Sequence, residues 1–164
     1  MIIFVKNKHT LQLDEFRFKC CIGKKGSTFN KKEGDQKTPK GTFEIENLYF
    51  RKDRIKRPIT SIKCLEIKDN MGWCDDINSP DKYNKLITLD KKFKYEKLKR
   101  KDSKYDLLIP IKYNFKRPVV GKGSCIFIHL TKDYKPTAGC IALNKKDFLI
   151  FLRLIKKKSK IKIF

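Results

Sequence analysis

Apolar and polar residues alternate with a period of two in several short stretches of this chain, which is the pattern of half-buried strands. Residues 2–5, which are all apolar, and residues 11–13, which alternate, lie on either side of the polar turn at Asn7 and Lys8, so they predict a hairpin. Residues 16–22 predict a third strand directly after it. Alternation predicts further strands over residues 42–45 and 62–67. Residues 106–113 predict a strong strand, residues 124–130 a buried strand, and residues 160–164 a closing strand.

The spacing of a helix is clearest near the C-terminus. Asn144 stands where an N-cap is expected, and the apolar positions between residues 148 and 155 share one helical face. Residues 93–100 predict a second, shorter helix, whereas residues 71–83, rich in Asp, Asn, Gly and Pro, predict a loop. Because no repeat or linker interrupts the pattern, we expect residues 1–164 to form a single, mainly β domain with one or two helices, arranged as a sandwich or barrel.

Charge adds a second feature. The 164 residues include 41 Lys and Arg against 18 Asp and Glu, a net charge of +23, which is typical of a protein with a polyanionic partner. Only 7 of the basic residues are Arg, the side chain that specific nucleic-acid readers use for bidentate contacts. We therefore expect no nucleic-acid partner, a mostly solvated lysine surface, and electrostatic association with anionic polymers of a cell envelope as the remaining option.

Six cysteines and two histidines are present, but their spacing matches no zinc site and contains no C-x-x-C pair. We therefore expect no metal and no cofactor. The sequence favours no particular disulfide pairing and no particular oligomeric state. The apolar run at the N-terminus ends at Lys6, which is too short for a secretion signal, and no apolar stretch approaches the length of a membrane span.

The candidate chemistry lies between residues 124 and 143. An apolar stretch ends at His129, and Cys140 follows a short loop later, directly after the small residues Thr137, Ala138 and Gly139. A cysteine nucleophile needs an imidazole to accept its proton and backbone amides to stabilise an oxyanion. This pattern makes Cys140 the candidate nucleophile, His129 the candidate base, and the backbone at Ala138 and Gly139 the candidate oxyanion site.

Several other stretches of the chain carry short motifs that resemble those of one known family. Residues 35–43 read D-x-x-T-P-x-G-x-F, residues 72–84 contain GWCDD, SP and YN, and residues 96–114 contain E-x-L, YD and YN, all ahead of the His129 and PTAGC block. Together, in this order, they resemble the L,D-transpeptidase (YkuD-type) family, in its variant that reads PTAGC. Two positions differ from the best-known motif of the family: Ala138 replaces a His and Ala142 replaces an Arg or Asn. Both changes belong to that variant, and they leave His129 as the one imidazole expected near the thiol.

The resemblance implies a cysteine acyl-transferase acting on peptidoglycan. Cys140 would attack a stem tetrapeptide, release its terminal D-alanine through a thioester, and pass the acyl group to an amine of another stem as an L,D cross-link, with His129 as base. It also implies a location in the periplasm or cell envelope. Because no signal peptide is visible in the chain, a cytoplasmic location stays open as the alternative.

Four residues are weaker candidates for substrate binding. Trp73 lines a donor groove or belongs to the core; Asp75 and Asp76 bind an amino group of the stem or shape a turn; Thr137 lies in the loop before the thiol. Two other functions fit the sequence. One is an L,D-carboxypeptidase, in which water accepts the acyl group, and the other is a non-catalytic basic module that binds anionic wall polymer or nucleic acid.

Overall fold

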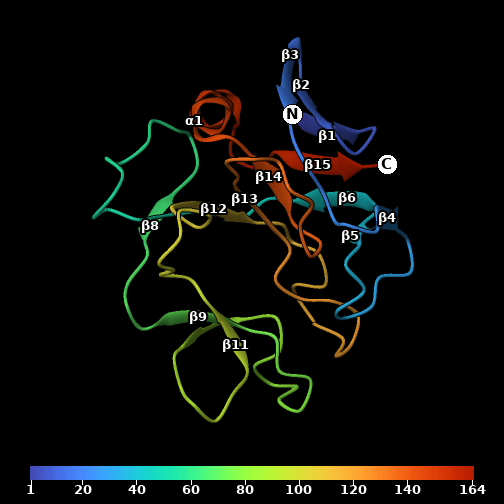
Figure 1. The fold of residues 1–164 in the computed structure, drawn as a ribbon, viewed down its shortest axis with the longest axis vertical. Helices are drawn as coiled ribbons and strands as arrows, with labels where there is room; N and C mark the ends of the chain where they lie inside the picture. Colours follow the sequence, from blue (N-terminus) through green and yellow to red (C-terminus); the bar gives the residue numbers. More distant parts are fainter.

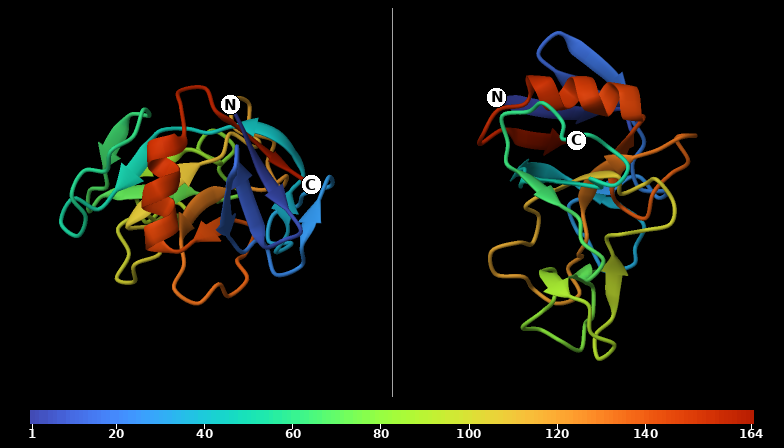
Figure 2. Two further views of the ribbon diagram at one scale, coloured as in Figure 1. Left: turned by 90° about the horizontal axis from the view of Figure 1, so that it is seen from above. Right: turned by 90° about the vertical axis from the view of Figure 1, so that its left-hand side faces the viewer.

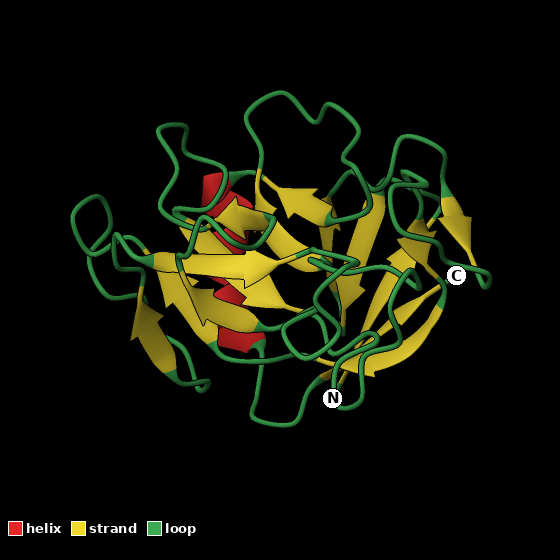
Figure 3. Ribbon diagram, turned by 90° about the horizontal axis from the view of Figure 1, so that it is seen from below, coloured by secondary structure: helices red, strands yellow, loops and turns green.

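The computed structural model describes residues 1–164 and consists mostly of strands, with one helix (Figure 3). One five-stranded sheet has the order β3 (Phe16–Lys19), β2 (Thr10–Leu13), β1 (Ile2–Lys6), β15 (Lys160–Ile163) and β6 (Gly41–Glu44). A second has the order β14 (Ile141–Leu143), β13 (Phe127–Leu130), β12 (Leu107–Pro110), β7 (Leu48–Phe50) and β8 (Cys64–Glu66). The smaller sheets are β10 (Leu86–Thr88), β9 (Met71–Cys74) and β11 (Tyr95–Lys97), and β4 (Ser27–Thr28) with β5 (Thr38–Pro39).

The first sheet joins the two ends of the chain. β1 forms the predicted hairpin with β2, in which Ile3 pairs with Leu13, and it also pairs in parallel with β15, in which Ile3 lies beside Ile161. These three side chains are fully buried, while their neighbours along each strand, Phe4, Gln12 and Lys162, are half-buried or exposed. The period-two pattern therefore matches the buried face of this sheet.

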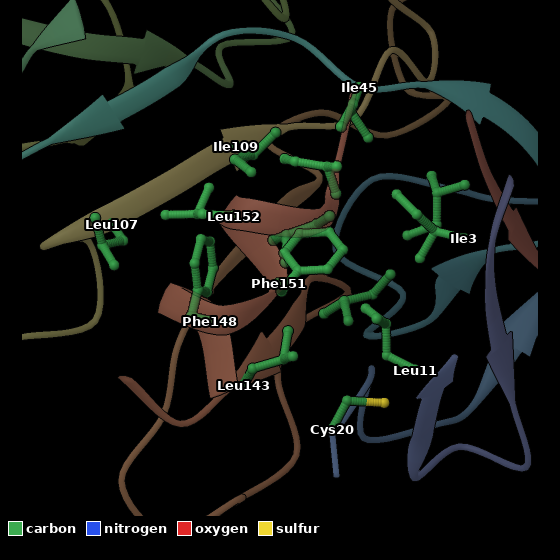
Figure 4. Packing of buried hydrophobic residues seen from close by; sticks show 14 of the residues in the cluster. Ile3, Leu11, Cys20, Ile45, Leu107, Ile109, Leu143, Phe148, Phe151 and Leu152 are labelled. Atoms are coloured by element: carbon green, nitrogen blue, oxygen red, sulfur yellow. The ribbon is translucent and has the colours of Figure 1, made fainter. Parts of the chain in front are cut away.

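The predicted C-terminal helix is α1 (Lys145–Leu154). The side chain of Asn144 caps it by accepting a 2.8 Å hydrogen bond from the backbone N–H of Asp147. Phe148, Phe151 and Leu152 are fully buried and join a cluster of 26 buried apolar residues contributed by both five-stranded sheets and by the helix (Figure 4). This large cluster is the main core of the domain.

The three-stranded sheet lies at the opposite end of the molecule from α1 (Figures 1 and 2). It corrects two predictions. Residues 71–83, predicted as a loop, contain β9, and residues 93–100, predicted as a helix, contain β11. β9 is the central strand, so Gly72 lies opposite both Ile87 and Lys97, and a Cβ on Gly72 would come within 2.6 Å of the side chain of Leu89. Both segments form strands because they pair with other strands, although their local composition favours a loop and a helix.

No helix of the structure is long and apolar enough to cross a membrane. All six cysteines are free thiols, so no disulfide constrains the fold.

Candidate active site

A cavity of about 620 Å³ lies between the second five-stranded sheet and the segment around β11. Both candidate catalytic residues, His129 and Cys140, line it. Of the other predicted site residues, Asp75, Thr137, Ala138 and Gly139 also line it, whereas Trp73 and Asp76 do not.

The sheet itself brings the imidazole and the thiol to one face. β13 and β14 are parallel neighbours, and His129 lies beside Ala142 in their register. Cys140 is two residues before Ala142, so its side chain points to the same side as the side chains of Ala142 and His129. Ile128 and Leu130 point to the other side, into the large cluster. Two segments separated by a ten-residue loop thus present His129 and Cys140 to the same cavity.

The imidazole of His129 is buried and fixed in one tautomer. Its Nδ1 lies 2.9 Å from the carbonyl oxygen of Leu130. A carbonyl can only accept, so Nδ1 carries the proton and Nε2 keeps a lone pair. Burial lowers the pKa of His129 to about 4, although the bond to Leu130 acts in the opposite direction. The ring is therefore a neutral base near pH 7.

The thiol of Cys140 is also neutral at rest. It donates a 3.1 Å hydrogen bond to the carbonyl oxygen of Cys125 and accepts one, at 3.4 Å, from the backbone N–H of Phe127. Burial raises the pKa of Cys140 to about 12, and the negative charge of Glu96 acts in the same direction. A thiolate would therefore form only as a base removes the proton during attack, rather than standing preformed.

The turn before Cys140 is held by Thr137. The Thr137 hydroxyl donates to the carbonyl oxygen of Cys140 at 2.6 Å and accepts from the N–H of Gly139 at 3.1 Å. The Gly139 amide, predicted as an oxyanion donor, is therefore already engaged, whereas the amides of Ala138 and Cys140 donate no hydrogen bond. Gly139 has φ of 148°, and a Cβ there would lie 2.9 Å from the carbonyl oxygen of Lys37. The turn therefore requires a glycine.

A second stretch supports this turn from below. Cys21 exchanges two backbone hydrogen bonds with Ala142, of 3.0 and 2.9 Å, and Gly23 forms a bridge with Thr137. The N–H of Gly23 in turn donates to the buried hydroxyl of Thr38 at 2.9 Å. Thr38, in the motif at residues 35–43, therefore holds Gly23 in place by this hydrogen bond, and Gly23 in turn pairs with Thr137 in the loop before Cys140.

Asp75 and Asp76 have separate roles in the structure. Asp75 lines the cavity, and its Oδ1 is buried without a hydrogen-bond partner. Burial raises the pKa of Asp75, against the opposing charge of Lys94 at 3.8 Å. Asp76 instead accepts hydrogen bonds from the backbone N–H groups of Asn78 and Lys94, at 2.9 and 3.1 Å. Asp76 shapes a turn, and Asp75 offers an unused acceptor to the cavity.

Trp73 is part of the core and does not reach the cavity. It is 3% exposed, and its ring packs edge to face against Phe127 at 5.3 Å between centroids. Its indole N–H donates to the side-chain oxygen of Asn84 at 2.9 Å, and that same oxygen accepts from the backbone N–H of Cys125 at 3.1 Å. Of the two positions that the sequence leaves open for Trp73, the structure has the core one: the indole supports, through Asn84, the backbone of Cys125, whose carbonyl oxygen accepts from the thiol of Cys140.

Charged residues beyond the predicted Asp75 and Asp76 line the cavity. The structure contains no group of three or more His, Cys, Asp or Glu side chains that could hold a metal ion. The charged lining residues outside the predicted set are Lys31, Glu33, Glu96, Arg100, Lys104, Asp133 and Lys135. The position of Glu96 in the stretch that resembles E-x-L was the one sequence signal for any of them.

The model of the L,D-transpeptidase catalytic domain family, YkuD, matches residues 1–163. Three solved structures are similar over 99% of this chain: the Bdellovibrio bacteriovorus protein Bd1075 (15% identity, TM-score 0.47, 47% of that chain), an L,D-transpeptidase from Mycobacterium smegmatis (12%, 0.42, 57%) and L,D-transpeptidase 1 from Mycobacterium tuberculosis (13%, 0.40, 59%). The chain therefore spans about half the length of these structures.

No curated protein matches the chain. The family model, however, covers all but the last residue and includes the stretch with His129 and Cys140. On that match, this chain belongs to the family of L,D-transpeptidase (YkuD) catalytic domains.

Proposed function

We propose that this domain is an active cysteine acyl-transferase, an L,D-transpeptidase of the PTAGC variant, and that it acts on peptidoglycan stem tetrapeptides. The single observation that carries the proposal is the shared cavity of Cys140 and His129, in which the imidazole has a free Nε2 and the thiol is buried. The family of the chain supplies the substrate class.

The proposed reaction begins with proton transfer from the Cys140 thiol to Nε2 of His129. The sulfur then attacks the carbonyl carbon between the third and fourth residues of the stem, and the amides of Cys140 and Ala138 donate to the oxyanion. Each such donor contributes about 3 kcal/mol in comparable enzymes. The imidazolium then protonates the nitrogen of the leaving D-alanine, and the acyl group stays on sulfur as a thioester.

The second half of the reaction transfers the acyl group. The amine of another stem attacks the thioester, His129 takes its proton, and the sulfur leaves as the thiol when the new amide forms. If water attacks instead, the product is a free carboxylate and the protein is an L,D-carboxypeptidase. The Asp75 carboxylate, with its buried unpaired Oδ1, is proposed to accept a hydrogen bond from an amino group of the substrate.

The test of the proposal is incubation of the wild type and of Cys140→Ala with a disaccharide-tetrapeptide. Cross-linked dimer with release of D-alanine, absent for the variant, is the expected result. Tripeptide without dimer would assign the carboxypeptidase reaction. Unchanged substrate with folded, reduced wild type would contradict both.

We propose that the domain works in the periplasm or cell envelope and that its charge of +23 holds it on anionic envelope polymers there. Attraction between exposed charges weakens as salt screens them. Sedimentation of the protein with isolated cell walls should therefore fall between low and high salt. Equal sedimentation at both salt concentrations would contradict the electrostatic association.

A further inference from the structure

Tyr105, in the loop before β12, packs directly against the imidazole of His129. The two rings meet edge to face, with centroids 5.4 Å apart and planes at 70°. The other edge-to-face contact of Tyr105 is with Phe127, at 5.8 Å and 90°. Since Tyr105 is only 5% exposed and lines the cavity, its ring limits the positions open to the imidazole.

The ring of Tyr105 is held in two directions. Its hydroxyl donates a 2.5 Å hydrogen bond to the carboxylate of Glu96 on β11. The guanidinium of Arg100 lies over the ring, 5.1 Å from the centroid, and is itself fixed by two hydrogen bonds to Asp102 of 3.0 and 2.7 Å. The carboxylate therefore fixes the polar end of Tyr105, and the cation covers one of its faces.

The imidazole needs such a contact because a single hydrogen bond fixes only one of its atoms. The bond from Nδ1 of His129 to Leu130 holds that nitrogen, but it leaves the ring free to tilt and so to change the direction in which Nε2 points. A rigid neighbour on the ring removes that freedom, and proton transfer depends steeply on such alignment.

We propose that Tyr105, anchored by Glu96, is a positioning residue that holds the imidazole of His129 in one orientation within the cavity that it shares with Cys140. The inference rests on the proposed function only in taking His129 as the base. It assigns a purpose to the three-stranded sheet, because β11 carries Glu96 and through it reaches the base on β13.

The test is a double-mutant cycle on the rate at which iodoacetamide alkylates Cys140 near neutral pH, followed by peptide mass analysis. His129→Ala should slow the alkylation strongly, and Tyr105→Phe should slow it about tenfold because the hydroxyl bond to Glu96 is lost. In the His129→Ala background, Tyr105→Phe should have no further effect, since its action passes through the imidazole. Tyr113→Phe is the matched control, because its hydroxyl donates to the Lys122 carbonyl outside the cavity, and it should leave the rate unchanged.

Two further variants keep the proposal testable if Tyr105→Phe does not fold. Glu96→Ala and Glu96→Gln both remove the charge that raises the pKa of Cys140, but only Gln keeps an acceptor for the Tyr105 hydroxyl, so Glu96→Ala should be alkylated about tenfold more slowly than Glu96→Gln. Equal slowing by Tyr105→Phe with and without His129 would overturn the positioning role. An unchanged rate in His129→Ala alone would instead contradict the base assignment of the proposed function.

Discussion

The two apolar clusters of this domain differ in what surrounds them. The large cluster, with 26 buried residues, joins both five-stranded sheets and α1. The small cluster, with eight, contains Trp73, Tyr105, Phe127 and Cys140 and borders a cavity lined with charged groups. Burial of apolar side chains in the large cluster stabilises the folded domain. The small cluster instead holds residues beside the cavity, where titratable groups are proposed to take part in catalysis. Substitutions in the two clusters should therefore change different measured quantities.

The largest expected effect separates Cys140, a member of the small cluster, from Cys125, which packs against that cluster. Cys140→Ala removes the nucleophile and should lower turnover by about 10⁴-fold or more, with the melting temperature nearly unchanged. Cys125→Ala should retain most of the activity, because Cys125 meets the sulfur of Cys140 through its backbone carbonyl and not through its own thiol. Turnover of a tetrapeptide by folded Cys140→Ala would contradict the assignment.

In the large cluster, Phe151→Ala should change stability and leave the chemistry alone. Phe151 is fully buried on α1, so the substitution should lower the free energy of unfolding by about 3–5 kcal/mol, measured by denaturant titration. Well below the new melting temperature, kcat of the folded fraction should match the wild type. A fall in kcat without a loss of stability would break the division between the clusters.

The buried base makes stability depend on pH. The pKa of His129 is about 4 in the folded protein against an ordinary value of 6.5, so the unfolded chain binds more protons between these values. The contribution of neutral His129 is complete above pH 6.5 and is lost as the pH falls toward 4, by up to about 3 kcal/mol. His129→Gln should flatten the free energy of unfolding in this window. An identical pH slope in this variant would mean that other groups control it.

The neighbouring carboxylates offer a sharper test of the cavity. Asp75→Asn keeps the shape but removes the charge, so KM for an amine-bearing stem peptide should rise about tenfold while kcat changes little. Asp76→Asn is the control, since Asp76 lies outside the cavity and serves a turn. Equal KM values for the two variants would remove Asp75 from substrate binding.

The smallest expected effect concerns Trp73. Trp73→Phe loses the indole hydrogen bond to Asn84, which still accepts from the backbone of Cys125, so the free energy of unfolding should fall by about 1–2 kcal/mol. KM should not change, because Trp73 does not line the cavity. A higher KM at unchanged stability would return Trp73 to the donor groove.

The sequence predicted the large cluster better than the small one, for a physical reason. Strands of the first sheet bury one face, so the buried Leu11 and Leu13 alternate with polar residues on β2, and α1 carries a cap and one apolar face. β9 instead pairs on both edges and contains Gly72, and β11 is three residues long and pairs only with β9. Neither strand has a local pattern that distinguishes it from a loop or a short helix.

The site could likewise be predicted only in part, namely where its residues lie close together in the sequence. Cys140 and His129 stand out because a thiol and an imidazole flank a short loop, and the parallel register of β13 and β14 brings them to one face. Tyr105 and Glu96 reach the cavity only through the arrangement of separate sheets, so their contact with His129 has no signature in spacing. The engaged amide of Gly139 likewise depends on the rotamer of the Thr137 hydroxyl.

The most direct test of the central claim is the location of the acyl group. The wild type would be mixed with a disaccharide-tetrapeptide, quenched in acid within the first turnover, and mapped by peptide mass spectrometry. We expect an adduct equal to the stem fragment without its terminal D-alanine, on Cys140 alone among the six free cysteines, and absent in Cys140→Ala. Turnover without any adduct, or an adduct on Cys125, would contradict it.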